Sequence, residues 1–272
     1  MNARMKQIWL SARFRDLWEG RDPFDEVERL NGEVFRQVKS RRTIRVVLDG
    51  QAYFAKIHHG VGWREIFKNL LQLKRPVVSA QNEWRALNLL TLAGVRTMTA
   101  TAFGCKGIDP ARIRSFLITE ELTGTTSLED VCAKWPQRPP AFALRKALCE
   151  QIASMVRRMH ARGVNHRDCY LCHFHLDTRS RPSQMEPEAL RLYVIDLHRA
   201  QIRRRTPCRW RIKDLAGLYF SALDIGLTRT DCLRFIRVYD GAPLNRAPWY
   251  RRWFWWRVRQ TGQALYRKLS HE

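Results

Sequence analysis

The chain has 272 residues, 45% of them hydrophobic, which is enough to build the core of one large domain or of two lobes. Lys and Arg outnumber Asp and Glu by 49 to 26, so the net charge of +23 favours anionic partners such as a nucleic acid, an acidic protein or a phosphate-bearing membrane surface. The sequence has no run of about 18 apolar residues and no signal-peptide core, so it predicts neither a membrane-spanning helix nor a signal peptide. The seven scattered cysteines favour free thiols, so we expect a cytoplasmic protein.

The first part of the chain is predicted to form a short helix and then a sheet. Asp22-Pro23 is a helix-start signal within residues 17–30. Three β-rich runs follow, at residues 34–38, 43–48 and 52–57. The last two are joined by Asp49-Gly50, which is a strong signal for a hairpin turn.

Lys56 lies inside the last of these strands, where a protein kinase has the lysine that binds the α- and β-phosphates of the nucleotide. Glu83, on a helix predicted to begin at Ser79 and end at Gly94, is placed to hold Lys56 by an ion pair. Taken alone, both residues are also consistent with solvent-facing side chains. No G-x-G-x-x-G segment precedes Lys56, and the nearest glycine in the expected place is Gly32.

Between Lys56 and this helix, residues 58–78 are predicted to insert a basic amphipathic helix. The apolar side chains on one face are Trp63, Ile66, Phe67, Leu70 and Leu71, and the basic ones outside it are Lys68, Lys74 and Arg75. Such a helix suits a membrane surface, or else it packs on its own domain.

The central motif is His166-Arg167-Asp168. It follows a strand at 115–122, which resembles a kinase hinge, and a helix whose apolar residues repeat from 144 to 159. In a kinase catalytic loop the Asp accepts the proton of the attacking hydroxyl, and the His and Arg hold the shape of the loop. His173 stands where the metal-binding Asn is usual, so we assign it provisionally to magnesium or phosphate.

Two further acids fit the same layout. Asp196 ends an apolar strand, 28 residues after Asp168, and corresponds to the kinase Asp that binds magnesium; Leu197-His198 replaces the usual Phe-Gly after it. Asp214 begins a buried helix and fits the residue that accepts hydrogen bonds from the catalytic-loop backbone, although it is equally suited to cap the helix.

Residues 199–213 contain seven basic side chains and no acid. We expect this segment to face an acceptor that already carries negative charge; the alternative is a solvated basic loop. The substrate-facing candidates are Arg203, Arg204, Arg205, Arg209 and Arg211. The tail from residue 249 mixes four tryptophans with arginines, which suits either the headgroup level of an anionic membrane or packing on the larger lobe.

Cys169-Tyr170-Leu171-Cys172-His173 matches the C-x-x-C-H pattern of haem attachment. Haem of that type belongs to exported proteins, and a zinc site would need His166, His173 or His175 as further ligands. We therefore expect Cys169 and Cys172 to be buried thiols.

In order, Lys56, Glu83, Asp168, Asp196 and Asp214 follow the protein-kinase layout, which predicts an α+β fold with two lobes. The stretches GVGWREIFKNLLQLKRPV, EWRALNLLTLAGV, GVNHRDCYLCHFHL, VIDLHRAQ and KDLAGLYFSALDIGLTR resemble the lipopolysaccharide core heptose(I) kinases of Gram-negative bacteria. The family shares DLH in place of DFG and the His at position 173.

The resemblance implies a small β-rich N-lobe at residues 1–122 and a mainly helical C-lobe at 123–272. It implies transfer of the γ-phosphoryl group of ATP, with Mg2+, to the first heptose of a lipid-A-anchored inner core at the cytoplasmic face of the inner membrane. It also suggests acyl carrier protein as a partner, which we hold as a hypothesis. The alternatives are a kinase for Kdo or another sugar, a protein-tyrosine kinase, and a non-catalytic module that binds an acidic partner; no motif supports nucleic-acid binding.

Overall fold

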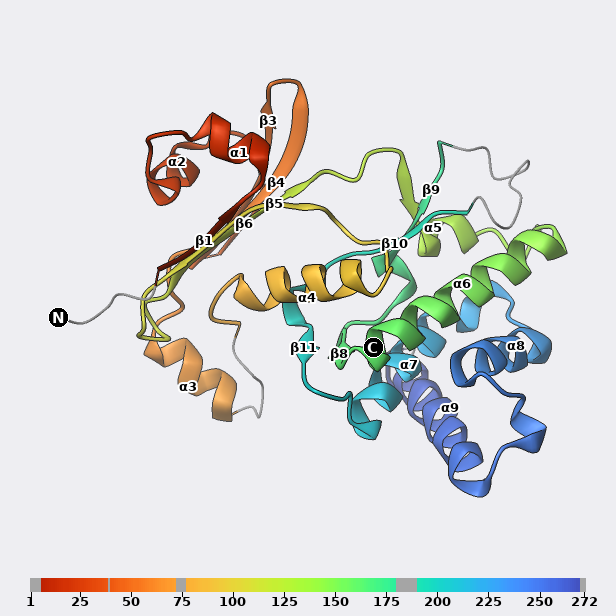
Figure 1. The fold of residues 1–272 in the computed structure, drawn as a ribbon. Helices are drawn as coiled ribbons and strands as arrows, with labels where there is room; N and C mark the ends of the chain where they lie inside the picture. Colours follow the sequence, from red (N-terminus) through yellow and green to blue (C-terminus); the bar gives the residue numbers. More distant parts are fainter. Residues whose placement is uncertain (1–5, 39, 72–76, 180–189, 270–272) are drawn as a thin grey trace. The chain divides into compact units, whose positions relative to one another are not determined.

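The computed structural model describes residues 6–38, 40–71, 77–179 and 190–269. The described residues divide into two compact units: one takes those up to residue 88 together with 98–122, and the other takes 89–97 and those from 123 onward. The first is built on a sheet and the second is mainly helical (Figure 1), so the predicted α+β fold is confirmed. Residues 89–97 group with the helical unit because Thr97 pairs with Val194 and donates its hydroxyl hydrogen to the Val194 carbonyl.

The sheet unit contains β1 (Lys6–Leu10), β2 (Glu33–Val38), β3 (Arg41–Leu48), β4 (Gln51–His58), β5 (Ala100–Lys106), β6 (Arg114–Glu120), α1 (Ala12–Leu17), α2 (Pro23–Arg29), α3 (Trp63–Leu71) and most of α4 (Gln81–Leu92). The strand order is β1-β5-β6-β4-β3-β2, and neighbouring strands are antiparallel. The predicted hairpin is present, and Asp49 and Gly50 take φ angles of 48° and 75° at its turn. The helix predicted to start at Asp22-Pro23 is α2, with Asp22 as its N-cap, and the sequence analysis did not anticipate α1, β1 or β5.

One face of this sheet is covered by α1 and α2 (Figure 1). Phe14 and Phe24 of these helices are almost fully buried in one apolar cluster with Tyr53, Ala55 and Ile57 of β4. Fully burying a side chain of this size contributes about 1.5–3 kcal/mol. Because successive side chains of a strand point to opposite faces, Lys56 faces the other side of the sheet.

On that other side, α4 packs against the sheet. The ring of Trp84 stacks on Phe103 of β5, with 4.4 Å between ring centroids and 6° between ring planes. This contact fixes the helix, and it places Glu83, the neighbour of Trp84, close to the sheet face that carries Lys56. The Ser79 hydroxyl accepts a hydrogen bond from the Gln81 amide at 3.4 Å, close to the predicted helix start, and Gly94 has a φ of 67° just past the helix end.

The helical unit contains α5 (Leu128–Cys132), α6 (Phe142–Ala161), α7 (Cys208–Ser221), α8 (Arg229–Asp240), α9 (Trp249–Leu269) and the short strands β7 (Thr125–Ser127), β8 (Val164–Asn165), β9 (Phe174–Asp177), β10 (Leu192–Val194) and β11 (Gln201–Ile202). The helix predicted around 144–159 is α6, and it ends before Gly163, whose φ is 77°. A Cβ at Gly163 would lie 1.7 Å from the Arg203 carbonyl oxygen. Glycine is therefore required where β8 pairs with β11 next to the His-Arg-Asp motif.

Two predicted segments differ from the structure. The apolar strand that was expected to end at Asp196 is limited to β10, because it stops at Val194 and Leu197 to Arg199 form a 3-10 turn. The basic segment 199–213 is not one loop, since residues from Cys208 onward belong to α7. Residues 180–189 lie outside the described part of the chain, and so do Lys74 and Arg75 of the predicted basic helix.

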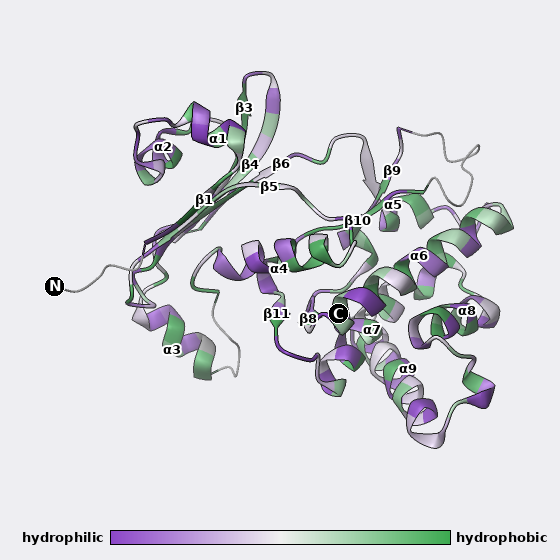
Figure 2. Ribbon diagram, in the orientation of Figure 1, coloured by the Kyte–Doolittle hydropathy of each residue, from purple (hydrophilic) through white to green (hydrophobic). Residues whose placement is uncertain are grey.

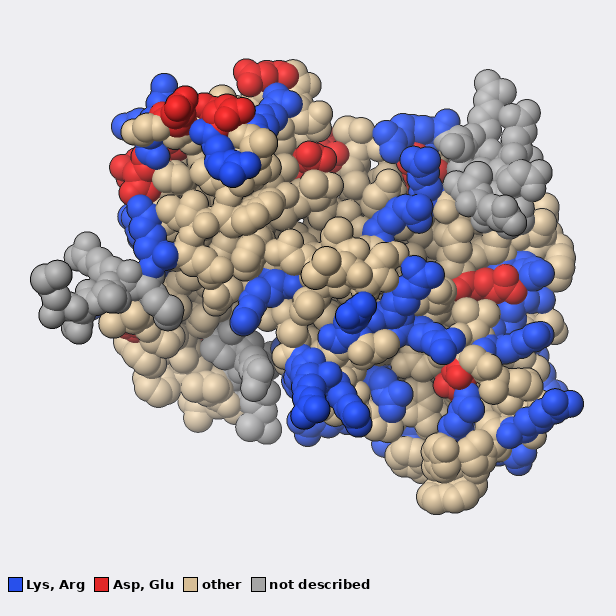
Figure 3. All heavy atoms as spheres, in the orientation of Figure 1, with Lys and Arg blue, Asp and Glu red and all other residues tan. Residues whose placement is uncertain are grey.

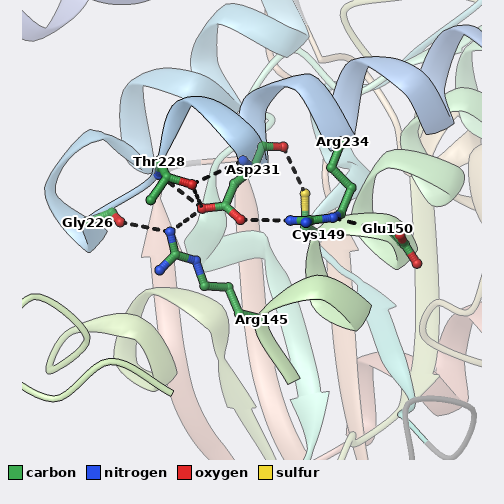
Figure 4. A network of polar contacts seen from close by, with 7 residues as sticks. All are labelled: Arg145, Cys149, Glu150, Gly226, Thr228, Asp231 and Arg234. Carbon is green, nitrogen blue, oxygen red and sulfur yellow. Dashed lines mark hydrogen bonds and ion pairs between the residues drawn. The ribbon is translucent and has the colours of Figure 1, made fainter. Parts of the chain in front are cut away.

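Helices α6 and α8 are joined by a buried polar network (Figure 4). Asp231 and Thr228 form a capping box at the start of α8, and the Asp231 carboxylate is 4% exposed. Arg145 of α6 pairs with this carboxylate, and Arg234 of α8 donates to its second oxygen at 2.9 Å. The single carboxylate thus ties a helix start to a neighbouring helix.

Candidate active site

The His166-Arg167-Asp168 loop directly follows β8, and α7 holds its backbone. The Asp214 carboxylate accepts a hydrogen bond from the His166 amide at 2.6 Å and another from the Arg167 amide at 2.9 Å. Arg167 has a φ of 75°, a left-handed conformation that is costly for a residue with a side chain and that these two bonds stabilise. The expected link between Asp214 and the loop backbone is present.

A second layer of buried contacts holds Asp214 itself. His160 of α6 lies with Nε2 3.2 Å from Oδ2 of Asp214, the oxygen that also accepts the His166 amide, and with Nδ1 2.8 Å from the Tyr239 hydroxyl of α8. Since a carboxylate only accepts, Nε2 carries the hydrogen. Burial raises the pKa of Tyr239 well above its usual range, so the phenol stays protonated. Helices α6, α7 and α8 therefore converge on the loop, a link that the sequence analysis did not find.

His166 connects the loop to the segment before Asp196. Its Nε2 donates to the Ile195 carbonyl at 2.9 Å, and burial lowers the pKa of the imidazole. The ring also stacks on His173, with 5.4 Å between ring centroids and 9° between planes. A neutral, buried imidazole with this contact supports the loop rather than exchanging protons.

His173 lies between the two acids of the site. Its Nδ1 is 2.6 Å from the Asp168 carbonyl oxygen, so Nδ1 carries the hydrogen and donates it. In the neutral ring, Nε2 then presents a lone pair, and this atom is 3.7 Å from Oδ2 of Asp196. Nε2 of His173 and the carboxylate of Asp196 therefore lie near each other, and the metal or phosphate role of His173 stays a prediction.

Asp196 takes a left-handed conformation, with φ 59° and ψ 52°, at the start of the 3-10 turn. Its Oδ1 accepts a hydrogen bond from Nδ1 of His198 at 2.5 Å. The sequence analysis treated His198 only as a departure from DFG, whereas the structure shows that it orients the Asp196 carboxylate. Its proximity in sequence to Asp196 was the only available signal.

The donor set around Asp196 fits magnesium held jointly with a nucleotide. Magnesium commonly takes one or two protein carboxylates, with phosphate oxygens and water completing its shell. Asp196 supplies such a carboxylate, and its other oxygen remains towards His173. Among the residues that the structure describes, no three or more His, Cys, Asp or Glu side chains are grouped to hold a metal by themselves.

The same finding bears on the C-x-x-C-H pattern. Cys169 is buried, Cys172 is partly buried, and both are free thiols. Burial raises the pKa of each thiol, most strongly at Cys169, and this disfavours the thiolate that zinc requires. Cys169 therefore matches the predicted buried thiol, and Cys172 is only partly buried.

A contact that the sequence analysis did not anticipate involves Asp168. Nη1 of Arg199 lies 2.7 Å from its Oδ1. Arg199 belongs to the basic segment, yet it follows Asp196 by three residues and is placed by the 3-10 turn. The turn therefore brings a cation directly to the carboxylate that was predicted to act as a base.

In the sheet unit, Nζ of Lys56 lies 2.6 Å from Oε1 of Glu83, and the carboxylate is buried. The predicted ion pair is therefore present. Gly32 does not lie in a phosphate loop: a Cβ there would be 2.0 Å from the Arg45 carbonyl oxygen, so this glycine allows close packing on β3. The hairpin of β2 and β3 that precedes Lys56 has no glycine at its turn.

The five candidate arginines of the basic segment separate into different environments. Arg203 donates to Asn165 at 2.8 Å and to Gln201 at 2.6 Å, next to the catalytic loop. Arg211 packs over the ring of Phe254 of α9, so it supports the helix pair. The remaining three are exposed: Arg204, Arg205 and Arg209. Figure 3 shows many more basic than acidic side chains on the visible face of the helical unit.

Comparison with known proteins agrees with this geometry. The family model described as the lipopolysaccharide kinase (Kdo/WaaP) family matches residues 25–239. A protein of Pseudomonas aeruginosa named lipopolysaccharide core heptose(I) kinase WaaP is 57% identical over 239 residues, covering 88% of both chains. A protein of Escherichia coli with the same name is 52% identical over 238 residues, covering 88% of this chain and 89% of the relative.

A solved structure, described as WaaP in complex with acyl carrier protein, is also similar. It has a TM-score of 0.82 and 47% sequence identity, and the match covers 96% of this chain and 99% of the other. The fold, the order of the site residues and these matches lead to one conclusion. The chain belongs to the lipopolysaccharide kinase (Kdo/WaaP) family.

Proposed function

We propose that this protein is an ATP-dependent kinase that phosphorylates the first heptose of the lipopolysaccharide inner core. The observation that carries the proposal is the Asp168 loop, held at two backbone amides by Asp214 in the manner of a phosphotransferase. The names of relatives at 52–57% identity supply the acceptor. A kinase for Kdo or for protein tyrosine is the alternative that the assay must distinguish.

Each site residue then has a role. Asp168 accepts the proton of the attacking hydroxyl, with His166 and Arg167 maintaining the loop. Lys56, held by Glu83, binds the nucleotide phosphates. Asp196 and His173 would hold Mg2+, which neutralises charge on the phosphates when bound. Because phosphoryl transfer depends on positioning and charge neutralisation, these fixed side chains account for the chemistry that the protein must supply.

We also propose that the protein works peripherally at the cytoplasmic face of the inner membrane. Helix α3 supports this, because Trp63, Phe67, Leu70 and Leu71 are exposed while Ile66 is buried. Figure 2 shows hydrophobic and hydrophilic residues alternating along α3. Helix α9 adds exposed Trp249, Trp253 and Trp256, which recur on one helical face beside arginines.

None of the described helices is long and apolar enough to span a membrane.

An acyl carrier protein is the second partner that we propose. The similar solved structure is described as WaaP in complex with acyl carrier protein, which supports this partner. The net charge of +23 supports it too, since a strongly basic surface favours association with an acidic protein. Mass spectrometry of the intact purified complex tests this directly. A preparation that contains no co-purifying carrier protein, and that binds none when it is added, would contradict it.

The activity test follows labelled γ-phosphate from Mg-ATP to lipopolysaccharide that contains heptose but lacks core phosphate. The parent is compared with Asp168→Ala, Asp196→Ala and, as a matched control, Asp16→Ala, because Asp16 is an exposed acid of α1. We expect transfer by the parent and the control only. Asp168→Ala should lower the rate roughly 10²- to 10⁴-fold while leaving ATP binding nearly intact. Label appearing on Kdo, on protein tyrosine or nowhere would reject the proposed acceptor.

A further inference from the structure

Trp210, in the first turn of α7, is surrounded by four cations. The guanidinium carbons of Arg167, Arg203 and Arg209 lie 5.7, 5.5 and 5.4 Å from its ring centroid, and Nζ of Lys213 lies at 5.5 Å. We call these five residues the Trp210 cluster. They come from the catalytic loop, from the segment after β11 and from α7, so the fold gathers charges that are distant in the sequence.

Holding these charges together is unfavourable without an anion. Two unit charges 8 Å apart repel by about 0.5 kcal/mol even in water, and by more near a protein surface. Arg209 also lies at the unfavourable end of a helix: the first turn of α7 has no acid and no side-chain cap, and positive charge at a helix N-terminus is disfavoured by about 0.3–1 kcal/mol. In the ion pairs that the described residues form, Arg209 and Lys213 have no carboxylate partner.

The indole adds a second observation. Nε1 of Trp210 is buried and has no hydrogen-bond partner among the described residues. Leaving a buried donor unsatisfied costs about 1–3 kcal/mol. The cluster therefore combines converging positive charge with an unused donor, an arrangement whose cost an anionic ligand would offset.

The position of the cluster relates it to catalysis. Arg167 is adjacent to Asp168 in the loop, and Lys213 is adjacent to Asp214, whose carboxylate accepts the Arg167 amide hydrogen bond. Arg203 donates to Asn165, the residue directly before the His-Arg-Asp motif. An anion bound here would lie beside the loop that carries the base.

We propose that the Trp210 cluster binds an anionic group of the acceptor, a carboxylate or a phosphate, and thereby places the acceptor hydroxyl at Asp168. This inference rests on the proposed function and names the feature of the acceptor that the site recognises. It also reduces the number of residues in the basic segment that are proposed to bind the acceptor. Arg203 and Arg209 bind it together with Arg167 and Lys213, whereas Arg211 packs on α9.

The test measures acceptor binding and transfer separately. Arg209→Gln, Lys213→Gln and the double variant are compared with the parent and with Arg237→Gln, a control that removes the same charge from an exposed residue of α8. Binding of the core-phosphate-free acceptor is measured by calorimetry, and KM and kcat are measured for acceptor and for ATP. Because Arg209 and Lys213 are exposed, we expect each variant to unfold at the same temperature as the parent, which would show that the variants are folded.

We expect each single variant to weaken acceptor binding and to raise the acceptor KM roughly 10- to 100-fold, the usual worth of a hydrogen bond to a charged group, with the ATP KM unchanged. Arg237→Gln should behave as the parent does. Two modified acceptors identify the source of the anion: one with its sugar carboxylates reduced to alcohols, the other with its lipid A phosphates removed. The modified acceptor that lacks the group recognised by the cluster should bind the parent protein weakly. It should bind the double variant no more weakly than it binds the parent.

Three results would overturn the inference: equal effects of Arg237→Gln and Arg209→Gln, an increase in the ATP KM instead of the acceptor KM, and full parent affinity for both modified acceptors. A parent that does not bind the acceptor would also overturn it. A failure of the proposed function can be told apart from a failure of this inference. In that case the parent would bind the acceptor through the cluster but would transfer no phosphate to its heptose.

Discussion

The guanidinium of Arg199 and the carboxylate of Asp168 form an ion pair, with 2.7 Å between Nη1 and Oδ1. Only one carboxylate oxygen takes part in this bond, so the other is available to a hydroxyl. Arg199 is held by the same 3-10 turn that begins at Asp196. The pair therefore links the orientation of the proposed base to the segment that carries the proposed magnesium ligand.

We expect Arg199→Gln to lower kcat roughly 10- to 100-fold, because a hydrogen bond to a charged partner contributes about 1.5–3 kcal/mol. The KM for ATP should change little, since Arg199 acts by positioning Asp168. Steady-state kinetics at saturating ATP check this. As a further readout, guanidinium ion should partly restore the activity of Arg199→Ala and should not restore that of Asp168→Ala. Near-parental kcat in Arg199→Gln, or the absence of rescue, would contradict the positioning role.

Asp214→Asn should strongly reduce both activity and stability. The two carboxylate oxygens accept amides from His166 and Arg167, and an asparagine offers one oxygen and one amide that itself donates. One loop amide would face another donor, and the left-handed Arg167 would lose support. We expect a kcat loss of at least about 10²-fold and a destabilisation of roughly 2–4 kcal/mol, measured by urea unfolding. Asp16→Asn, an exposed control, should change neither.

The sequence predicted the features that depend on local pattern or on one well-spaced motif. The hairpin at Asp49-Gly50 and helix α6 follow from turn chemistry and apolar periodicity. The Lys56–Glu83 pair followed from the order of kinase motifs, and its geometry agrees. In each case the information lies within a short stretch or in a known spacing.

Other contacts depend on tertiary placement and were not predictable. Strand β1 is short and pairs with β5, which is about 95 residues further along the chain, so no local signal marks the pairing. His198 and Arg199 reach Asp196 and Asp168 only because residues 197–199 form a 3-10 turn in place of the expected strand end. Charge patterning alone likewise failed to separate Arg211, which packs on Phe254, from the other basic side chains.

The double variant Phe67→Ser, Leu71→Ser should weaken binding to vesicles that contain anionic lipid. These side chains are 57% and 86% exposed on α3, and an exposed amphipathic helix inserts its apolar face at the headgroup boundary. Co-sedimentation with vesicles of phosphatidylglycerol and phosphatidylethanolamine measures the change, which we expect to be about tenfold or more. Leu92→Ser is the matched control, because Leu92 is 77% exposed on a different helix. Equal losses in both variants would refute a specific contribution from α3.

Asp231 is expected to make the stability of the helical unit sensitive to acid. Burial alone would raise its pKa, but hydrogen bonds from Thr228 and Arg145 outweigh burial, and the pKa of the folded protein lies below its ordinary value. A lowered folded pKa means that the stabilisation is present above the unfolded pKa, near 3.9, and is lost as the pH falls through the folded pKa.

The variant Asp231→Asn removes this charge from between Arg145 and Arg234 and weakens the capping box of α8. Because breaking a buried ion pair leaves its partner uncompensated, we expect a loss of about 3–5 kcal/mol at pH 7. Urea unfolding at a series of pH values from 7 downward measures the difference between parent and variant, which should shrink once the pH falls below about 4. A difference that stays constant over that range would show that the Asp231 charge does not stabilise the contact between α6 and α8.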